Sequence, residues 1–285
     1  MEINKIFLGD SLEVLKTFPD ESVDCAITSP PYWELRDYGV SGQLGLETTF
    51  QEYITKLCNI FDEVKRVLKK TGTCWVNLGD TYLDKSLCQV PSHFAIEMCK
   101  RGWLLRNRII WHKPNCMPSG VDDRFTVDFE DVFFFTKSQS YHFEQQFDQR
   151  KTFEERKDAI VRDREENYNS KASKLRGTGM ARHGAKGSTL NNPEKWDPLG
   201  KNKRCVWSIP TKGNSEAHFA TYPEALIAPM IKAGCPEKGI VLDIFMGSGT
   251  TAVTARKLGR NYLGIDLNPE YIKIAEKRLI QQVLL

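Results

Sequence analysis

The sequence lacks long apolar runs and closely paired cysteines. No run approaches the roughly 20 apolar residues needed to cross a bilayer, which excludes a helical membrane span, and no membrane partner is expected. Eight cysteines are scattered through apolar segments and none has C-x-x-C spacing, so neither a disulfide framework nor a metal site is expected. Residues 1–10 lack the apolar core of a signal peptide, and we therefore expect a cytoplasmic protein.

A strong net charge is also missing. The chain carries only +3, with 40% hydrophobic and 27% charged residues, which is typical of a soluble globular protein. The charge is nevertheless uneven, because residues 171–204 hold nine Lys or Arg against Glu194 and Asp197. This segment has a charge of +7, which leaves −4 for the rest of the chain. A local basic segment favours contact with a polyanion; a solvated basic loop is the alternative.

Hydrophobic periodicity predicts alternating strands and helices on either side of one irregular segment. Apolar residues between positions 50 and 70 recur at i, i+3, i+4 and i+7, which indicates a helix. Residues 23–28 form the short apolar run of a buried strand. Residues 143–204 contain a polar, glycine-rich stretch without a period. We expect a doubly wound, mostly parallel α/β sheet formed by residues 1–142 and 205–285, with the irregular segment inserted.

A strand–turn–helix unit near the C-terminus predicts a nucleoside site. Gly247 and Gly249 fit the G-x-G-x-x-A pattern, and Asp266 ends the next strand, where it can accept hydrogen bonds from a ribose. A pyrophosphate would bind at the following helix N-terminus. Asp243 and Phe245 precede the turn, and a carboxylate there suits a sulfonium or ammonium group better than a pyrophosphate. The turn therefore favours S-adenosylmethionine over NAD, and an NAD-dependent oxidoreductase is the alternative.

A second motif, Ser29-Pro30-Pro31-Tyr32, ends the strand at 23–28. Ligands of doubly wound sheets bind at the carboxyl ends of strands. The two prolines remove backbone N–H donors and leave carbonyl acceptors, Ser29 adds a hydroxyl, and Tyr32 and Trp33 offer flat faces. This combination suits a planar base that is held by its exocyclic amine.

The Ser-Pro-Pro-Tyr motif resembles the catalytic motif of amino-methylating DNA methyltransferases, and residues 242–251 resemble their cofactor motif. Segments 109–118 and 219–227 also resemble blocks of this family. The catalytic motif precedes the cofactor motif, a circularly permuted order similar to that of the beta group. The resemblance implies a seven-stranded methyltransferase sheet that uses S-adenosylmethionine, with residues 143–204 as a target-recognition region for double-stranded DNA.

Serine at the first motif position implies a cytosine-N4 methyltransferase, with adenine-N6 as the alternative. The target base must be flipped out of the duplex, and its amine would donate to the Ser29 hydroxyl and the Pro30 carbonyl. No covalent intermediate and no metal are needed. Non-catalytic DNA binding, and methylation of RNA or a protein amine, remain rival interpretations. A restriction endonuclease acting on the same site is an expected partner, and the enzyme is expected to be a monomer or homodimer.

The resemblance also assigns roles to individual residues. Three of the cofactor residues named below have a rival interpretation. Asp10 is alternatively a helix N-terminal carboxylate, and Phe219 and Tyr222 are alternatively core residues. Among the DNA-binding residues named below, Trp33 alternatively lines the pocket, and Lys113 and Asn115 are alternatively solvated turn residues. The catalytic residues are Ser29, Pro30, Pro31 and Tyr32. The cofactor residues are Asp10, Phe219, Tyr222, Pro223, Asp243, Phe245, Gly247, Ser248, Gly249, Thr250 and Asp266. The DNA-binding residues are Trp33, Lys113, Asn115, Lys201, Lys203 and Arg204.

Overall fold

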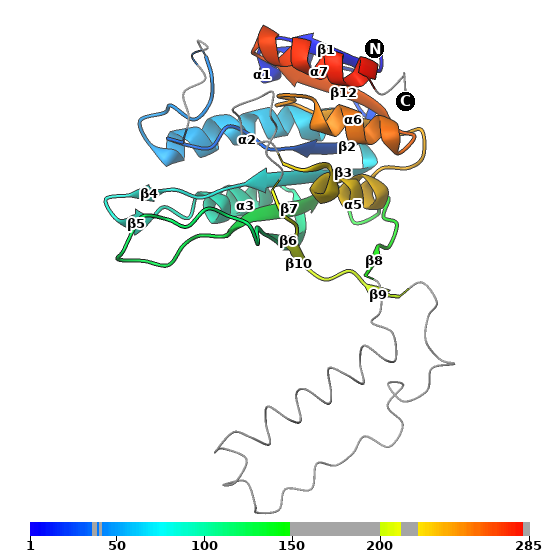
Figure 1. The fold of residues 1–285 in the computed structure, drawn as a ribbon. Coiled ribbons are helices and arrows are strands. Elements are labelled where there is room, and N and C mark those ends of the chain that lie inside the picture. The colour runs from blue at the N-terminus through cyan, green and yellow to red at the C-terminus, as the bar shows by residue number, and fades with distance from the viewer. Residues whose placement is uncertain (36–38, 40–41, 149–199, 212–221, 282–285) are drawn as a thin grey trace, which may run out of the picture. The chain divides into compact units, whose positions relative to one another are not determined.

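The chain divides into two compact units. The larger comprises Met1–Glu144 with Cys205–Leu285, and the smaller is Gln145–Arg204. The structure is a computed structural model that describes residues 1–35, 39, 42–148, 200–211 and 222–281 (Figure 1).

The larger unit is built on an eight-stranded sheet with the order β1-β12-β11-β2-β3-β7-β6-β10. Neighbouring strands are parallel, except that β7 is antiparallel to both β3 and β6. The predicted mostly parallel α/β sheet is thereby confirmed. The strands are β1 (Lys5–Leu8), β2 (Val23–Thr28), β3 (Leu68–Leu78), β6 (Leu104–His112), β7 (Phe129–Thr136), β10 (Val206–Ser208), β11 (Ile240–Asp243) and β12 (Asn261–Asp266).

The sheet has one strand more than the seven expected. The additional strand, β10, pairs in parallel with the edge strand β6, where Trp207 lies opposite Trp111. Only the central residue of this three-residue strand is buried. The burial period of a strand is two residues, so three residues are too few for a periodic pattern to be recognised in the sequence.

Helices cover both faces of the sheet. One hydrophobic cluster joins α1, α2 and α3 to one face, and a second cluster joins α5, α6 and α7 to the other. Among the described helices, none is both long and apolar enough to cross a membrane. The helices are α1 (Ser11–Lys16), α2 (Phe50–Val67), α3 (Val90–Lys100), α5 (Glu224–Gly234), α6 (Thr250–Lys257) and α7 (Pro269–Gln281).

Helix α2 follows the predicted periodicity but ends earlier than position 70. The Thr49 hydroxyl accepts a hydrogen bond from the backbone N–H of Glu52 at 3.2 Å and caps the first turn. The helix ends at Val67 because Leu68 adopts an extended conformation and begins β3. The polar residues that follow therefore extend a strand, rather than the helix.

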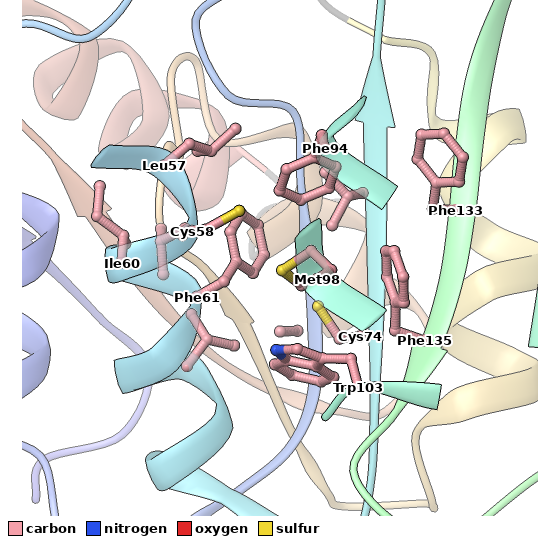
Figure 2. Packing of buried hydrophobic residues seen from close by; sticks show 14 of the residues in the cluster. Leu57, Cys58, Ile60, Phe61, Cys74, Phe94, Met98, Trp103, Phe133 and Phe135 are labelled. Carbon is pink, nitrogen blue, oxygen red and sulfur yellow. The ribbon is translucent and has the colours of Figure 1, made fainter. Parts of the chain in front are cut away.

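Aromatic side chains fill the space between α2, α3 and the sheet (Figure 2). Phe61 and Phe94 meet edge to face, with ring centroids 5.3 Å apart. Phe135 of β7 lies against Phe94 at 6.2 Å. Edge-to-face pairs of this kind contribute roughly 0.5–1.5 kcal/mol beyond the area they bury. This packing holds β3 and β7 in place, and both strands contribute to the cavity described next.

Candidate active site

A cavity of about 270 Å³ lies in the larger unit. Its walls come from the carboxyl ends of β2, β3, β6 and β12, from the turn after β11 and from the start of β7. This is the edge at which ligands of open α/β sheets bind. Twelve of the residues expected at the site line the cavity: Asp10, Ser29, Pro30, Pro31, Tyr32, Lys113, Tyr222, Phe245, Gly247, Ser248, Thr250 and Asp266.

The glycine turn between β11 and α6 forms one half of the cavity. Gly247 has φ +52°, and Gly249, which caps α6, has φ +80°. A side chain at Gly249 would place its Cβ 2.6 Å from the Cβ of Ala275, so glycine lets α7 approach the turn. Arg278 of α7 donates to the Ser248 carbonyl at 2.6 Å. Helix α7 thus packs against one side of the turn, and the other side of the turn lines the cavity.

Asp266 braces this turn and also lines the cavity. Its Oδ2 accepts from the backbone N–H of Gly247 at 2.6 Å, and its Oδ1 accepts from that of Asn268 at 2.8 Å. Burial raises the pKa of Asp266, opposed by these two hydrogen bonds. A carboxylate has about four lone-pair sites, so Asp266 retains acceptor capacity toward a ligand hydroxyl.

Asp243 does not line the cavity, contrary to its expected position beside the ligand. It is 1% exposed and lies in the protein interior. Its Oδ1 accepts from Thr28 Oγ1 at 2.7 Å, and its Oδ2 accepts from Tyr222 Oη at 2.8 Å and from Thr251 Oγ1. The backbone N–H of Phe245 is a fourth donor, at 3.1 Å. Asp243 therefore ties the end of β2 to the glycine turn and fixes Tyr222, which does face the cavity.

The Ser-Pro-Pro-Tyr motif forms the opposite half. Tyr53 of α2 donates its hydroxyl to the Pro31 carbonyl at 2.8 Å, which anchors the motif to the helix. Within the described part of the chain, no donor engages the Pro30 carbonyl. Ser29 is half-buried at the cavity wall. The two acceptors predicted to hold a target amine, the Ser29 hydroxyl and the Pro30 carbonyl, are therefore adjacent in the chain and available.

A polar network behind this motif was missed by sequence reasoning. Tyr32 Oη donates to Glu130 Oε2 at 2.8 Å, and Asn77 Nδ2 donates to the same oxygen at 3.0 Å. Lys113 forms an ion pair with the other carboxylate oxygen of Glu130. Burial, reinforced by the Glu130 charge, raises the pKa of Tyr32 well above its usual range. The only sequence signal for Glu130 is a pair of acidic residues, Glu130 and Asp131, ahead of an apolar run in the same strand.

Lys113, which the sequence predicts to contact DNA, lines the cavity. Its ammonium group lies 4.5 Å from the centroid of the Trp111 ring as well as against Glu130. A cation over an indole face is favourable, most strongly where water is excluded. Lys113 is thus part of the cavity wall.

Two other residues that the sequence predicts to contact DNA make hydrogen bonds within the protein. Trp33 is 2% exposed, donates its Nε1–H to the Glu47 carbonyl at 2.8 Å and packs edge to face on Phe50. The Asn115 side chain pairs with the backbone of Thr211, donating at 2.9 Å and accepting at 2.8 Å. Neither residue lines the cavity. A buried Trp33 has no face for DNA, so this assignment is corrected.

The remaining cofactor assignments have mixed outcomes. Asp10 accepts from the Glu13 backbone N–H at 3.1 Å as the N-cap of α1, and it also lines the cavity. Tyr222 lines the cavity, whereas Pro223 is buried as the N-cap of α5. Phe219 lies outside the described residues.

The smaller unit contains a short antiparallel pair, β8 (Phe147–Asp148) with β9 (Lys201–Asn202). Lys203 forms an ion pair with Asp148 at 3.3 Å, and the backbone N–H of Arg204 donates to the same carboxylate at 3.4 Å. Lys201 is exposed. One of the three basic residues assigned to DNA is therefore neutralised within its own unit.

The cavity fits a nucleoside that carries a positive charge. Asp10 and Asp266 provide acceptors on the glycine-turn side, and Phe245 provides an apolar face. Two carboxylates at this wall would repel a pyrophosphate, which disfavours a dinucleotide. Within the described part of the chain, no group of His, Cys, Asp or Glu is placed to hold a metal ion.

Comparisons with known proteins agree with this chemistry. The model of a family described as DNA methylase, covering N6 and N4 enzymes, matches residues 23–277. The type II methyltransferase M.Cfr9I of Citrobacter freundii is 36% identical, over 98% of this chain and 89% of its own length. The type II methyltransferase M.SmaI of Serratia marcescens is 33% identical, over 98% of this chain and 91% of its own length.

Solved structures share the fold. The PvuII DNA methyltransferase, described as cytosine-N4-specific, matches with a TM-score of 0.69 at 20% identity, over 98% of this chain and 86% of that one. The protein TTHA0409 of Thermus thermophilus, solved in complex with S-adenosylmethionine, matches with a TM-score of 0.63 at 24% identity. That match covers 98% of this chain and 95% of the other.

Proposed function

Because the chain belongs to the N6/N4 DNA methylase family, we propose that it methylates the exocyclic N4 amine of cytosine in double-stranded DNA. Enzymes of this family are DNA methyltransferases that use S-adenosylmethionine. The observation that carries the choice of cytosine is Ser29 at the first position of the catalytic motif, at the wall of the cavity. Adenine-N6 methylation is the alternative outcome of the test below.

The chain's own residues would bind and orient the target amine. A base inside a duplex cannot reach the cavity, so it must be flipped out of the stack. Its amino hydrogens would then be accepted by the Ser29 hydroxyl and the Pro30 carbonyl. Two acceptors favour the pyramidal form of the nitrogen, whose lone pair is more nucleophilic than in the planar amine. S-adenosylmethionine, when bound, supplies the electrophilic methyl group, and positioning provides most of the acceleration.

The cofactor would be held on the glycine-turn side. We assign Asp266 to the ribose hydroxyls, because it retains acceptor capacity after bracing the turn. Phe245, Gly247, Ser248 and Thr250 would line the rest of this half. Asp243 would act indirectly, through the Tyr222 side chain that it holds.

The reaction and the site are tested together by product analysis. Expression in a host whose DNA lacks methylated amines should produce N4-methylcytosine, measured by mass spectrometry of nucleosides. Ser29→Ala should lower the rate by about 10²–10³-fold, the range seen when one stabilising group at a reacting centre is removed. N6-methyladenine as the product would contradict the choice of base and leave the site intact. A fully active Ser29→Ala variant would contradict the assigned role of serine.

The basic segment is expected to contribute sequence-independent affinity for DNA. Each neutralised phosphate changes the slope of log K against log salt by about 0.9. Replacing Lys201, Lys203 and Arg204 by glutamine should therefore flatten this slope by about two to three units in fluorescence-anisotropy titrations. A matched variant with Lys5, Lys16 and Lys273 changed to glutamine removes the same charge elsewhere. Equal slopes for wild type and the first variant would rule out phosphate contacts by these three residues.

A cognate restriction endonuclease that recognises the same site is the expected partner. The curated relatives are type II methyltransferases. Methylation of the shared site would then protect the host DNA from cleavage.

A further inference from the structure

Glu130 is the centre of the polar network behind the catalytic motif. It stands at the start of β7 and lines the cavity. Three donors reach its carboxylate: the Tyr32 hydroxyl at 2.8 Å, the Asn77 amide at 3.0 Å and the Lys113 ammonium group. The carboxylate is 16% exposed, so its charge is largely screened from water and balanced by Lys113.

The chemistry of these groups fixes the direction of each hydrogen bond. An ionised carboxylate only accepts, and an ammonium group only donates. Tyr32 must therefore donate its proton to Glu130, which leaves the Tyr32 oxygen as an acceptor. Ser29 Oγ lies 3.4 Å from that oxygen and donates to it. The Ser29 proton is thus directed at Tyr32, and the oxygen lone pairs of Ser29 remain for a ligand.

We propose that Glu130 is a positioning residue for methyl transfer, because it orients the Ser29–Tyr32 hydrogen bonds so that Ser29 only accepts from the target amine. The inference rests on the proposed transfer to an exocyclic amine and applies equally to cytosine and adenine. If Tyr32 donated to Ser29 instead, one lone pair of the Ser29 oxygen would be occupied, and the Ser29 proton would be free to point at the target amine. Ser29 would then meet a donor with a donor, or with fewer lone pairs.

The next residue of the strand, Asp131, already has the structural role of linking β7 to its neighbour β6. Asp131 forms a bidentate pair with Arg108, with distances of 2.7 and 3.0 Å, and is 5% exposed. It does not line the cavity. Asp131 links β7 to β6, so holding these strands together does not require the Glu130 charge. The two neighbouring carboxylates therefore form a matched pair for an experiment.

Glu130→Gln is the decisive variant, because it keeps the shape of the side chain and replaces one carboxylate oxygen, an acceptor, with an NH₂ group, a donor. The glutamine oxygen would face Lys113, since its NH₂ group is repelled by the ammonium. The NH₂ group would then face Tyr32 and the Asn77 amide, which donates to the same oxygen in the wild type. The Tyr32 hydroxyl would turn toward Ser29 Oγ or Asn77 Oδ1, each 3.4 Å from the Tyr32 oxygen, and the Ser29–Tyr32 hydrogen bond would lose its fixed direction. We expect kcat to fall by up to about 100-fold, the cost of a misplaced group at a reacting centre, while KM for DNA and the Kd for S-adenosylmethionine change by less than about twofold.

Three comparisons decide between positioning and structure. Asp131→Asn should keep kcat within about twofold of wild type, and an equal loss in this variant would overturn the inference. Glu130→Asp retains an acceptor-only group and should be more active than the isosteric Glu130→Gln; the reverse order would count against it. Melting temperature and cofactor Kd establish that each variant is folded.

A double-mutant cycle tests whether Glu130 acts through Tyr32. Tyr32→Phe removes the hydroxyl that joins Glu130 to Ser29, so adding Glu130→Gln should cost less than about twofold more in kcat. Fully multiplicative losses would overturn the inference. An active wild type with an unimpaired Glu130→Gln variant would refute the inference alone. A wild type that methylates neither amine would refute the proposed function, and the inference with it.

Discussion

Replacing Gly79 with alanine should lower the rate of methyl transfer by at least about 10²-fold in a protein that remains folded. Gly79 follows the end of β3, and an added Cβ would lie 2.5 Å from Cε2 and 2.9 Å from Cδ2 of Tyr32. The ring must therefore move, and its hydroxyl loses the contact with Glu130. Misplacement by about 1 Å at a reacting centre can cost on the order of 10²-fold in rate.

The Gly79 prediction is checked by single-turnover rates measured with saturating cofactor and DNA. The backbone of Gly79 does not have a positive φ angle, so alanine brings no conformational strain of its own. Gly120→Ala is the matched control, because an added Cβ there meets no atom within 4 Å. Circular dichroism and the Kd for S-adenosylmethionine should be unchanged in both variants. A near-normal rate for Gly79→Ala would show that the position of the Tyr32 ring does not limit transfer.

Asp243→Ala is expected to have the largest effect on stability. It leaves four donors in the protein interior without their acceptor: Thr28, Tyr222, Thr251 and the Phe245 backbone. The threonine hydroxyls can rotate toward other acceptors and the Tyr222 hydroxyl can donate to Thr251 Oγ1 at 2.5 Å, so at least one donor, the Phe245 N–H, stays unsatisfied, at about 1–3 kcal/mol. We expect the free energy of unfolding to fall by at least about 1–3 kcal/mol. Cofactor affinity should fall as well, because Tyr222 loses its anchor.

Urea denaturation at constant pH measures the Asp243 effect. Asp123→Ala is the control, since it removes a carboxylate from a surface pair with Lys85 and should change stability by less than about 1 kcal/mol. Asp243→Asn should lie between wild type and alanine, because an amide still accepts through one oxygen. Similar stabilities for Asp243→Ala and Asp123→Ala would contradict the four-donor arrangement.

Sequence periodicity predicted most of the fold because burial imposes it directly. The spacing of apolar residues in Phe50–Val67 reproduces the face that packs on the sheet. The short apolar run at 23–28 is β2, which is buried along its whole length. Each of these signals is local, so a single chain is sufficient to recognise it.

Strand β10 and the position of Trp33 could not be predicted in this way. A three-residue strand has too few positions to show a period, and its place depends on β6, which lies far away in the sequence. An aromatic residue beside a catalytic motif has the same sequence pattern whether it faces a ligand or the core. Trp33 faces the core because the Glu47 carbonyl accepts its Nε1–H and the Phe50 ring packs against its indole.

The amino-acid sequence by itself determined the two motifs and the mostly parallel sheet. These depend on residue types at short spacing, which encode local backbone geometry and charge. Only the tertiary structure decided that Asp243 braces the interior and that Glu130 meets Tyr32, 98 positions away. Hydrogen-bond partners depend on distances of about 3 Å, and folding alone brings such remote donors and acceptors together.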